Sequence, residues 1–309
     1  KEYIDETGSI KPKTDFPGNK VIIGMVDGAQ NIPAIGELDD WKEVYGSWSN
    51  ADNTIIENNV VVILSGTMGN VMGSYNGGET VNSSTIGNAV NVSGVSSIHG
   101  SVYGGWADKG DAAYNEVTVS GENVVVDGSI IGGFSNEGKA THNIVTINGG
   151  TAENGIIGGY VANGSCNAEN NIININGGKI GYHIYGGYGD SSSGKVTNNI
   201  VNISGTPIFS DTVVIYGGYS YSGVANSVTA GNELNIHTGG LQAGNVENFE
   251  YYNFYLQSDT SANDVLLTLN NGITTDVSSS KLNVNLEGST TRLQVGDIFA
   301  TTTPNFRVD

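Results

Sequence analysis

A five-residue phrase recurs along this chain at nearly constant intervals. It consists of Val or Ile, one variable residue, Gly, then Gly or Ser, and an aromatic residue. Its seven copies are residues 44–48, 71–75, 102–106, 130–134, 156–160, 184–188 and 215–219. Successive copies start 27, 31, 28, 26, 28 and 31 residues apart. A fixed period in this range, with short β-type phrases in every period, is the sequence signature of a solenoid.

A second phrase lies between these copies and reads as a strand. It begins with Asn and then alternates Val or Ile with polar residues before a Ser or Asn and a Gly. The copies are residues 88–94, 115–121, 143–149, 171–177, 199–205 and, more loosely, 232–239. The alternation predicts a half-buried strand with a wet outer face. We expect the opening Asn to take a left-handed backbone conformation and to hydrogen-bond its stacked equivalents through its amide.

Strand alternation also assigns sides within the first phrase, because successive side chains point to opposite faces. Position one is always Val or Ile and is expected to face inward. Position five has the same parity, which predicts an internal aromatic ladder of Trp48, Tyr75, Trp106, Phe134, Tyr160, Tyr188 and Tyr219. Position two then faces outward and forms a candidate binding stripe of Tyr45, Met72, Tyr103, Ile131, Ile157, Tyr185 and Tyr216. The alternative is that a loop or a corner covers position two.

The repeats divide the chain into three parts. Residues 1–40 lack the repeat and are expected to cap the first coil, with a strand at Val21–Val26. Residues 41–245 hold the parallel coils, of about 28 residues each. Residues 246–309 are expected to close the last coil with strands at 248–256, 265–269, 281–286 and 292–298, and antiparallel pairing is one arrangement we consider for them.

Charge and composition exclude several classes of partner. The 309 residues carry 31 acids against 12 bases, and the only bases between Glu43 and Ser280 are Lys109, Lys139, Lys179 and Lys195. No basic stripe exists that would neutralise phosphates, so we predict neither nucleic acid nor membrane partners. Cys166 is the single cysteine, so no internal disulfide forms. We find no signal peptide and no apolar run of bilayer length, and we expect a mature or excised fragment.

Three features together resemble passenger domains of autotransporter adhesins, as in large surface proteins of anaerobic Gram-negative bacteria such as fusobacteria. They are Ile-Tyr-Gly-Gly-Tyr at 184–188, the Asn-x-Val-x-Ile-x-Gly-Gly phrase, and the aromatic segment 244–256. The resemblance covers roughly residues 41–298. It implies an all-β, right-handed, single-stranded parallel β-helix, capped at both ends and displayed outside the cell. The matching motifs are structural, so the resemblance implies no catalytic residue.

Candidate catalytic and metal-binding chemistry is sparse. His99, His142, His183 and His237 each fall at a different phase of the repeat, so no metal-ligand spacing appears and neither a metal site nor a cofactor is predicted. The segment 186–190 is similar to the calcium β-roll motif, but it does not recur in tandem as that motif requires. Incidental binding of Ca²⁺ in the acidic loops is an alternative that the sequence leaves open. No pair of carboxylates is singled out for glycoside hydrolysis.

We therefore predict a non-enzymatic, extracellular bacterial surface adhesin that presents a rigid face to a host-cell protein, to a glycan or to a second copy of itself. Two other classes remain open. One is a polysaccharide-degrading enzyme or tailspike on the same scaffold, which would carry clustered carboxylates in a cleft. The other is a structural stalk or surface-layer unit with no ligand.

Overall fold

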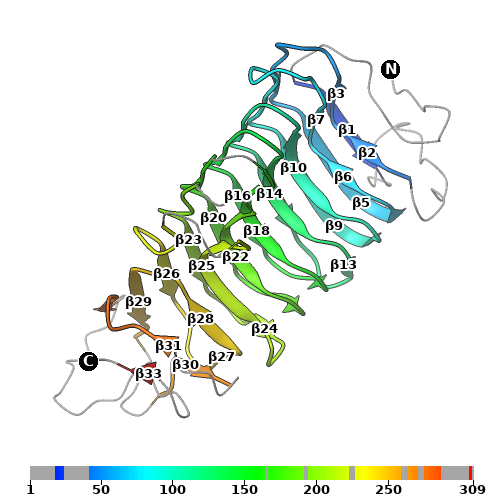
Figure 1. The fold of residues 1–309 in the computed structure, drawn as a ribbon. Helices are drawn as coiled ribbons and strands as arrows, with labels where there is room; N and C mark the ends of the chain where they lie inside the picture. The colour runs from blue at the N-terminus through cyan, green and yellow to red at the C-terminus, as the bar shows by residue number, and fades with distance from the viewer. Residues whose placement is uncertain are drawn as a thin grey trace.

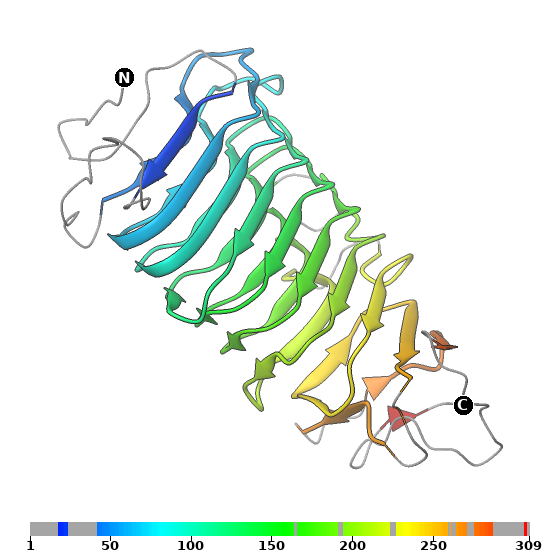
Figure 2. The same cartoon turned by 180° about the vertical axis from the view of Figure 1, so that it is seen from behind.

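The computed structural model is an elongated solenoid of parallel strands with about eight turns (Figures 1 and 2). It describes residues 18–23, 42–163, 166–190, 194–222, 227–258, 260, 264–270, 275–286 and 306–307. Within these ranges every regular element is a strand. The all-β parallel solenoid predicted from the repeat is thus confirmed.

One turn shows how the two phrases are used. The first phrase forms β10 (Val102–Ala107), and after a short loop the chain adds the two-residue strand β11 (Ala112–Ala113). The second phrase forms β12 (Glu116–Val119), and a glycine turn leads to β13 (Val124–Val126). The next turn begins at β14 (Ile130–Ser135). This turn therefore contributes to three parallel sheets, which we call A, B and C: β10 to sheet A, β11 to sheet C, and both β12 and β13 to sheet B.

Sheet A consists of the first phrases. Its strands are β2 (Val44–Tyr45), β3 (Trp48–Ser49), β6 (Val71–Met72), β7 (Tyr75–Asn76), β10, β14, β18 (Ile156–Val161), β22 (Ile184–Gly189), β25 (Val214–Ser220) and β28 (Asn245–Glu247). Sheet C consists of the short corner strands β4 (Ile56–Glu57), β8 (Thr85–Ile86), β11, β15 (Ala140–Thr141) and β19 (Ala168–Glu169).

Sheet B consists of the second phrases and the rungs that follow them. Its strands are β1 (Lys20–Ile23), β5 (Val60–Met68), β9 (Ala89–Ile98), β12, β13, β16 (Ile144–Ile147), β17 (Thr151–Ala152), β20 (Ile172–Ile175), β21 (Lys179–Ile180), β23 (Ile200–Ile203), β24 (Ile208–Phe209), β26 (Glu233–Ile236), β29 (Tyr251–Leu256) and β32 (Lys281–Leu286). Two small pairs complete the fold: β27 (Leu241–Ala243) with β30 (Leu267–Leu269), and β31 (Thr275–Asp276) with β33 (Phe306–Arg307).

Matching residues of successive turns lie side by side in register. Val102 pairs with Ile130 and Ile130 pairs with Ile156, and all three side chains are fully buried. The second phrase pairs in the same way, and its Val and Ile residues face the same interior. Because neighbouring strands are about 4.8 Å apart, each apolar side chain contacts its equivalents above and below, and an aliphatic core runs along the axis.

The opening asparagines form a buried ladder along the corner between sheets C and B. The Asn115 Nδ2 donates to Asn143 Oδ1 at 3.2 Å, and Asn143 Nδ2 donates to Asn171 Oδ1 at 3.0 Å. The amide-stacking expectation is confirmed, but the left-handed backbone belongs to the preceding residue, as at Tyr114 (φ 57°) and His142 (φ 57°). The turn into sheet B is therefore made one residue earlier than the sequence pattern predicts.

The C-terminal strands continue the parallel stack instead of closing it with an antiparallel arrangement. Strand β29 pairs in parallel with both β26 and β32. The turn that leads to β29 is short, since ladder partners Asn235 and Asn253 are 18 residues apart. At the other end, β1 (Lys20–Ile23) confirms residues 21–23 of the predicted strand 21–26. Residues 1–17 and 24–40 of the predicted N-terminal cap and the predicted strand 292–298 lie outside the described residues.

Candidate functional site: an aromatic face on sheet A

The glycine pair in each sheet A strand reverses the alternation of side chains. In β10 and β14 the register runs Tyr103 with Ile131 and then Gly105 with Gly133, so position three is passed over. A Cβ on Gly132 would lie 2.4 Å from the Gly158 carbonyl oxygen, and this close backbone approach requires glycine. Position four is glycine for another reason, because a Cβ on Gly133 would lie 2.5 Å from the Asn143 amide. Side-chain alternation is therefore offset by one residue between positions two and five, so that these two positions point to the same side of sheet A.

The prediction of an internal aromatic ladder is therefore wrong about the side on which the rings lie. None of the position-five side chains belongs to the interior core, whereas position six is fully buried, as in Ala107 and in Val161, which packs with Ala140, Ala168 and Val196. The rings lie on the outer surface of sheet A together with position two. We call this surface the aromatic face: Tyr45, Trp48, Met72, Tyr75, Tyr103, Trp106, Ile131, Phe134, Ile157, Tyr160, Tyr185, Tyr188, Tyr216 and Tyr219.

Position two points outward, in line with the candidate binding stripe, but much of the stripe lies beneath the rings of position five. Ile131 and Ile157 are only 3% and 6% exposed, and Tyr185 is 8% exposed. They pack against the partly exposed rings of the same cluster and not against a covering loop. The ligand-accessible part of the face is therefore made mainly by position five together with Tyr103 and Tyr216.

The rings of the aromatic face contact one another from turn to turn. The ring centroids of Trp106 and Phe134 are 4.2 Å apart, those of Phe134 and Tyr160 are 5.0 Å apart, and those of Tyr160 and Tyr188 are 4.7 Å apart. In the neighbouring column Tyr185 and Tyr216 stack at 5.2 Å with an interplanar angle of 4°. These are favourable aromatic distances, so the rings hold one another in fixed orientations.

Carboxylates at the edge of sheet A fix the outer ends of the rings. Asp108 accepts a hydrogen bond from Trp106 Nε1 at 2.7 Å and another from the Tyr75 hydroxyl at 3.0 Å. Asp190 accepts from the Tyr160 hydroxyl at 2.8 Å. Burial and then the neighbouring Asp108 raise the pKa of Tyr75 to about 12, and burial raises the pKa of Tyr160 further. The phenols therefore remain uncharged hydrogen-bond donors at neutral pH.

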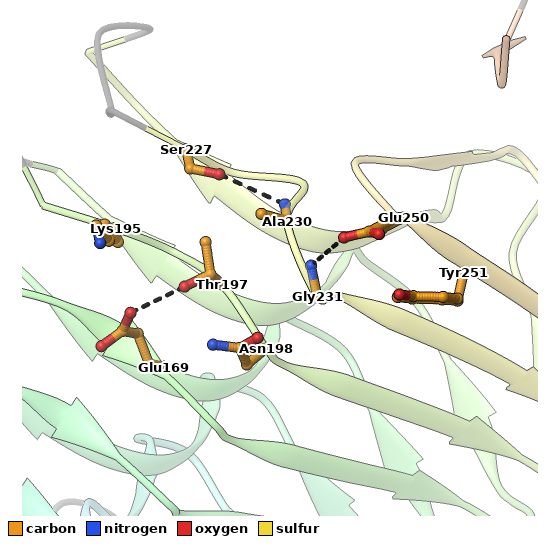
Figure 3. Close-up of a pocket in the computed structure, with 9 residues that line it drawn as sticks. All are labelled: Glu169, Lys195, Thr197, Asn198, Ser227, Ala230, Gly231, Glu250 and Tyr251. Carbon is orange, nitrogen blue, oxygen red and sulfur yellow. Dashed lines mark hydrogen bonds between the residues drawn. The ribbon is translucent and has the colours of Figure 1, made fainter. Parts of the chain in front are cut away.

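A second surface feature is a polar cleft of about 490 Å³ at the sheet C corner (Figure 3). Its lining residues are Glu169, Lys195, Thr197, Asn198, Ser227, Ala230, Gly231, Glu250 and Tyr251. Its carboxylates are engaged within the protein. Glu169 accepts from the Thr197 hydroxyl at 2.9 Å, and Glu250 accepts from the Gly231 N–H at 2.8 Å. Hydrogen bonds from Lys281 and from Gly231 lower the pKa of Glu250 to about 2.

The cleft opens where the short turn omits a sheet C rung. The last contact in that column is the bridge from Lys195 to Ser227. In the following turn only residues 248–250 separate β28 from β29, so no corner strand covers Lys195 and Ser227. Phe249, which is 1% exposed, fills the interior at this shortcut. The cleft is thus a consequence of coil length, which is visible in the sequence only as an irregular spacing after residue 232.

The histidines do not come together, and in the described part of the chain no three His, Cys, Asp or Glu residues form a group able to hold a metal ion. His99 Nδ1 lies 2.7 Å from Asp127, and His142 and His237 stack on tyrosines. His183 lies beside the aromatic face at 6.1 Å from the Tyr185 ring, and burial lowers its pKa. Burial raises the pKa of the Cys166 thiol, which disfavours its thiolate.

Comparison of the chain with protein-family models, with curated proteins and with solved structures found no match. Among the described residues there is no helix of the length and apolar character needed to cross a membrane. The functional assignment therefore depends on the chemistry of the aromatic face and of the cleft.

Proposed function

We propose that this chain is a non-enzymatic binding and display protein, an extracellular adhesin of the autotransporter-passenger type, and that the aromatic face is its contact surface. The observation that carries this proposal is the continuous column of partly exposed rings on the outside of sheet A. Apolar residues exposed over several neighbouring strands are typical of interaction surfaces in soluble proteins.

The rigidity of the face supports the same proposal. Tyr75, Trp106 and Tyr160 are each held at the ring and at the polar end, by neighbouring rings and by Asp108 or Asp190. A ring that is already ordered loses little conformational freedom when a ligand binds, so more of the contact energy is retained as affinity. Tyr and Trp are also the residues that contribute most strongly at protein interfaces.

The test is a comparison of the chain with a variant of the aromatic face. We expect the chain to bind host cells, an arrayed glycan or itself, and we expect Tyr160→Ser combined with Tyr188→Ser to abolish that binding. Tyr114→Ser combined with Tyr255→Ser is the matched control, because these two tyrosines lie away from sheet A. Circular dichroism establishes that both variants remain folded.

Cell binding, glycan arrays and light scattering of the chain alone are the three measurements. If none of the three measurements detects binding, a binding role is rejected and the structural stalk is favoured. If the aromatic-face variant still binds, the contact surface lies elsewhere on the solenoid.

A further inference from the structure

We infer that the aromatic face binds a cationic ligand, namely an extended segment of a partner protein that is rich in Lys or Arg. The inference rests on the proposed binding function and adds to it the chemistry of the partner. It follows from the charges around the face, from a related contact elsewhere in this molecule and from the spacing of the carboxylates.

Carboxylates lie at both edges of the aromatic face. At the ends of the strands Asp108 and Asp190 accept hydrogen bonds from the rings. At the beginning of the strands Glu43 accepts from the Tyr45 hydroxyl and from Asn70 Nδ2. Glu247 pairs with Tyr216 in register and occupies position two of the following turn. These bonds hold each negative charge in place beside the rings.

No base compensates these charges within sheet A, since its strands contain neither Lys nor Arg. Lys109 is paired with Glu137, Lys179 belongs to β21 of sheet B, and Lys195 lies at the sheet C corner. Lys42 precedes Glu43 in the chain, and Lys109 interacts with Asp108 as well as with Glu137, whereas no strand of sheet A carries a base beside Asp190 and Glu247. The aromatic face therefore combines the negative π surfaces of the rings with a net excess of carboxylates. Such a surface attracts cations and repels acidic glycans and other anions.

The same molecule already holds a cation by this chemistry on sheet B. The Lys281 ammonium lies 4.5 Å from the centroid of the Tyr251 ring and 2.8 Å from Glu250 Oε1. It also donates to the Tyr251 hydroxyl at 3.0 Å. A tyrosine ring with an adjacent carboxylate thus contacts an ammonium group here, on a lysine that the pairing of β29 with β32 brings close. On the aromatic face, Tyr160 and Tyr188 beside Asp190 offer the same groups to a cation from outside.

The spacing of the carboxylates determines how such a segment would lie. Asp108 and Asp190 follow β10 and β22, which are three turns apart in sheet A. At about 4.8 Å per turn their separation along the solenoid axis is about 14 Å. An extended peptide covers that distance in about four residues. The geometry therefore fits a segment aligned with the axis that carries a basic residue at every fourth position.

The experiment uses synthetic peptides as probes. One carries three lysines four residues apart in a serine background, and a second has the same composition with its lysines adjacent. Binding is followed by the fluorescence of the chain, because Trp48 and Trp106 belong to the aromatic face. We expect the spaced peptide to bind at least about fivefold more tightly than the clustered one, with an affinity that falls as salt rises.

Charge-matched variants separate a local effect from the overall negative charge. Asp108→Asn with Asp190→Asn retains hydrogen-bond acceptors and should weaken binding of the spaced peptide about tenfold. Glu116→Gln with Glu122→Gln removes the same charge from sheet B and its following turn and should change it less than twofold. If the first pair unfolds the protein, Glu247→Gln tests the other edge of the face.

Equal losses in the two charge-matched pairs would overturn the inference, because net charge alone would then explain the binding. Salt-independent binding of the neutral sugar cellopentaose to the aromatic face, without binding of the lysine peptides, would also overturn it. In that case the proposed binding function would survive. The absence of binding to cells, to glycans and to a second copy of the chain would instead reject the proposed binding function itself.

Discussion

The interior of the solenoid and its aromatic face are both apolar, and the same sheet A strands build both, yet they differ in residue type and in exposure. The interior column, as in Ile130, Ile156 and Ile184, is aliphatic and fully buried. The outer column, as in Trp106, Tyr160 and Tyr188, is aromatic, partly exposed and hydrogen-bonded to carboxylates. A repeated apolar position in a solenoid therefore contributes either to the stability of the core or to a contact surface, depending on the face of the strand on which it lies.

The largest expected difference between the two sides comes from identical truncations at adjacent residues. Ile156→Ala empties space in the interior, where Ile156 is fully buried, and should lower the free energy of unfolding by about 2–5 kcal/mol. Ile157→Ala removes the same atoms beneath the aromatic face, where partly exposed rings can close the gap, and should cost about half as much. Urea unfolding followed by circular dichroism measures both losses. Equal losses would mean that the aromatic face is a second core.

The buried asparagine ladder supports sheet A from inside and should show the next effect. Asn143→Ala leaves the buried Asn115 backbone N–H without its acceptor and removes one of the two acceptors of Asn115 Nδ2, which still donates to the Thr85 carbonyl, and should cost about 1–3 kcal/mol. Asn148→Ala is the control, because Asn148 accepts from Asn176 in an exposed ladder and should change the free energy of unfolding by less than about 0.5 kcal/mol. A similar cost at both positions would contradict the role of burial.

The first glycine of each sheet A phrase shifts the backbone and so separates the interior side chains from the aromatic face. A methyl group at this glycine tests that role. Gly132→Ala places a Cβ against the Gly158 carbonyl, so the backbone must shift, at a cost of about 1–3 kcal/mol. We also expect a changed near-ultraviolet circular dichroism signal, because Phe134 lies two residues further along the same strand. Gly239→Ala is the matched control, since its Cβ would meet only Leu266 at 3.8 Å. A neutral Gly132→Ala would show that the strand tolerates a side chain there.

The smallest effect concerns the phenols of the aromatic face at alkaline pH. The pKa values of Tyr75 and Tyr216 are raised to about 12, first by burial and then by nearby carboxylates. A phenol with a raised pKa in the folded state contributes stability below its unfolded pKa of about 10 and loses that contribution as pH rises through the folded value. The free energy of unfolding should therefore fall between about pH 10 and 12. Tyr75→Phe should make this fall shallower, and an unchanged slope would contradict the assignment.

Much of the fold could be predicted from residue spacing because stacking is governed by coil length. The period that places Val102, Ile130 and Ile156 at equal intervals also places them in one column of the structure. The opening asparagines followed from the same logic, since an amide that recurs once per turn meets its equivalents. The parallel course of β29 and β32 was not predicted, because their spacing departs from the repeat.

The candidate site could be predicted only in part. Position two was correctly placed outside, but nothing in the sequence pattern pointed to Asp108 and Asp190 as partners of the rings. They occur in two of the seven turns, so no repeat signal marks them. The cleft beside Glu250 depends on an omitted corner strand and was likewise absent from the sequence pattern.

The sequence by itself determined the length of the coil, the parallel register and the identity of the residues that stack, because these depend only on how many residues make one turn. The tertiary structure alone decided on which side of sheet A the rings lie. Counting positions one to five by strict alternation places Tyr160 inside, whereas the contact of Gly158 with the Gly186 carbonyl of the next turn shifts the strand and turns Tyr160 outward. That contact joins backbones that are far apart in sequence. The recurring glycine at position three permits it, but the sequence does not show that the contact offsets the side-chain alternation.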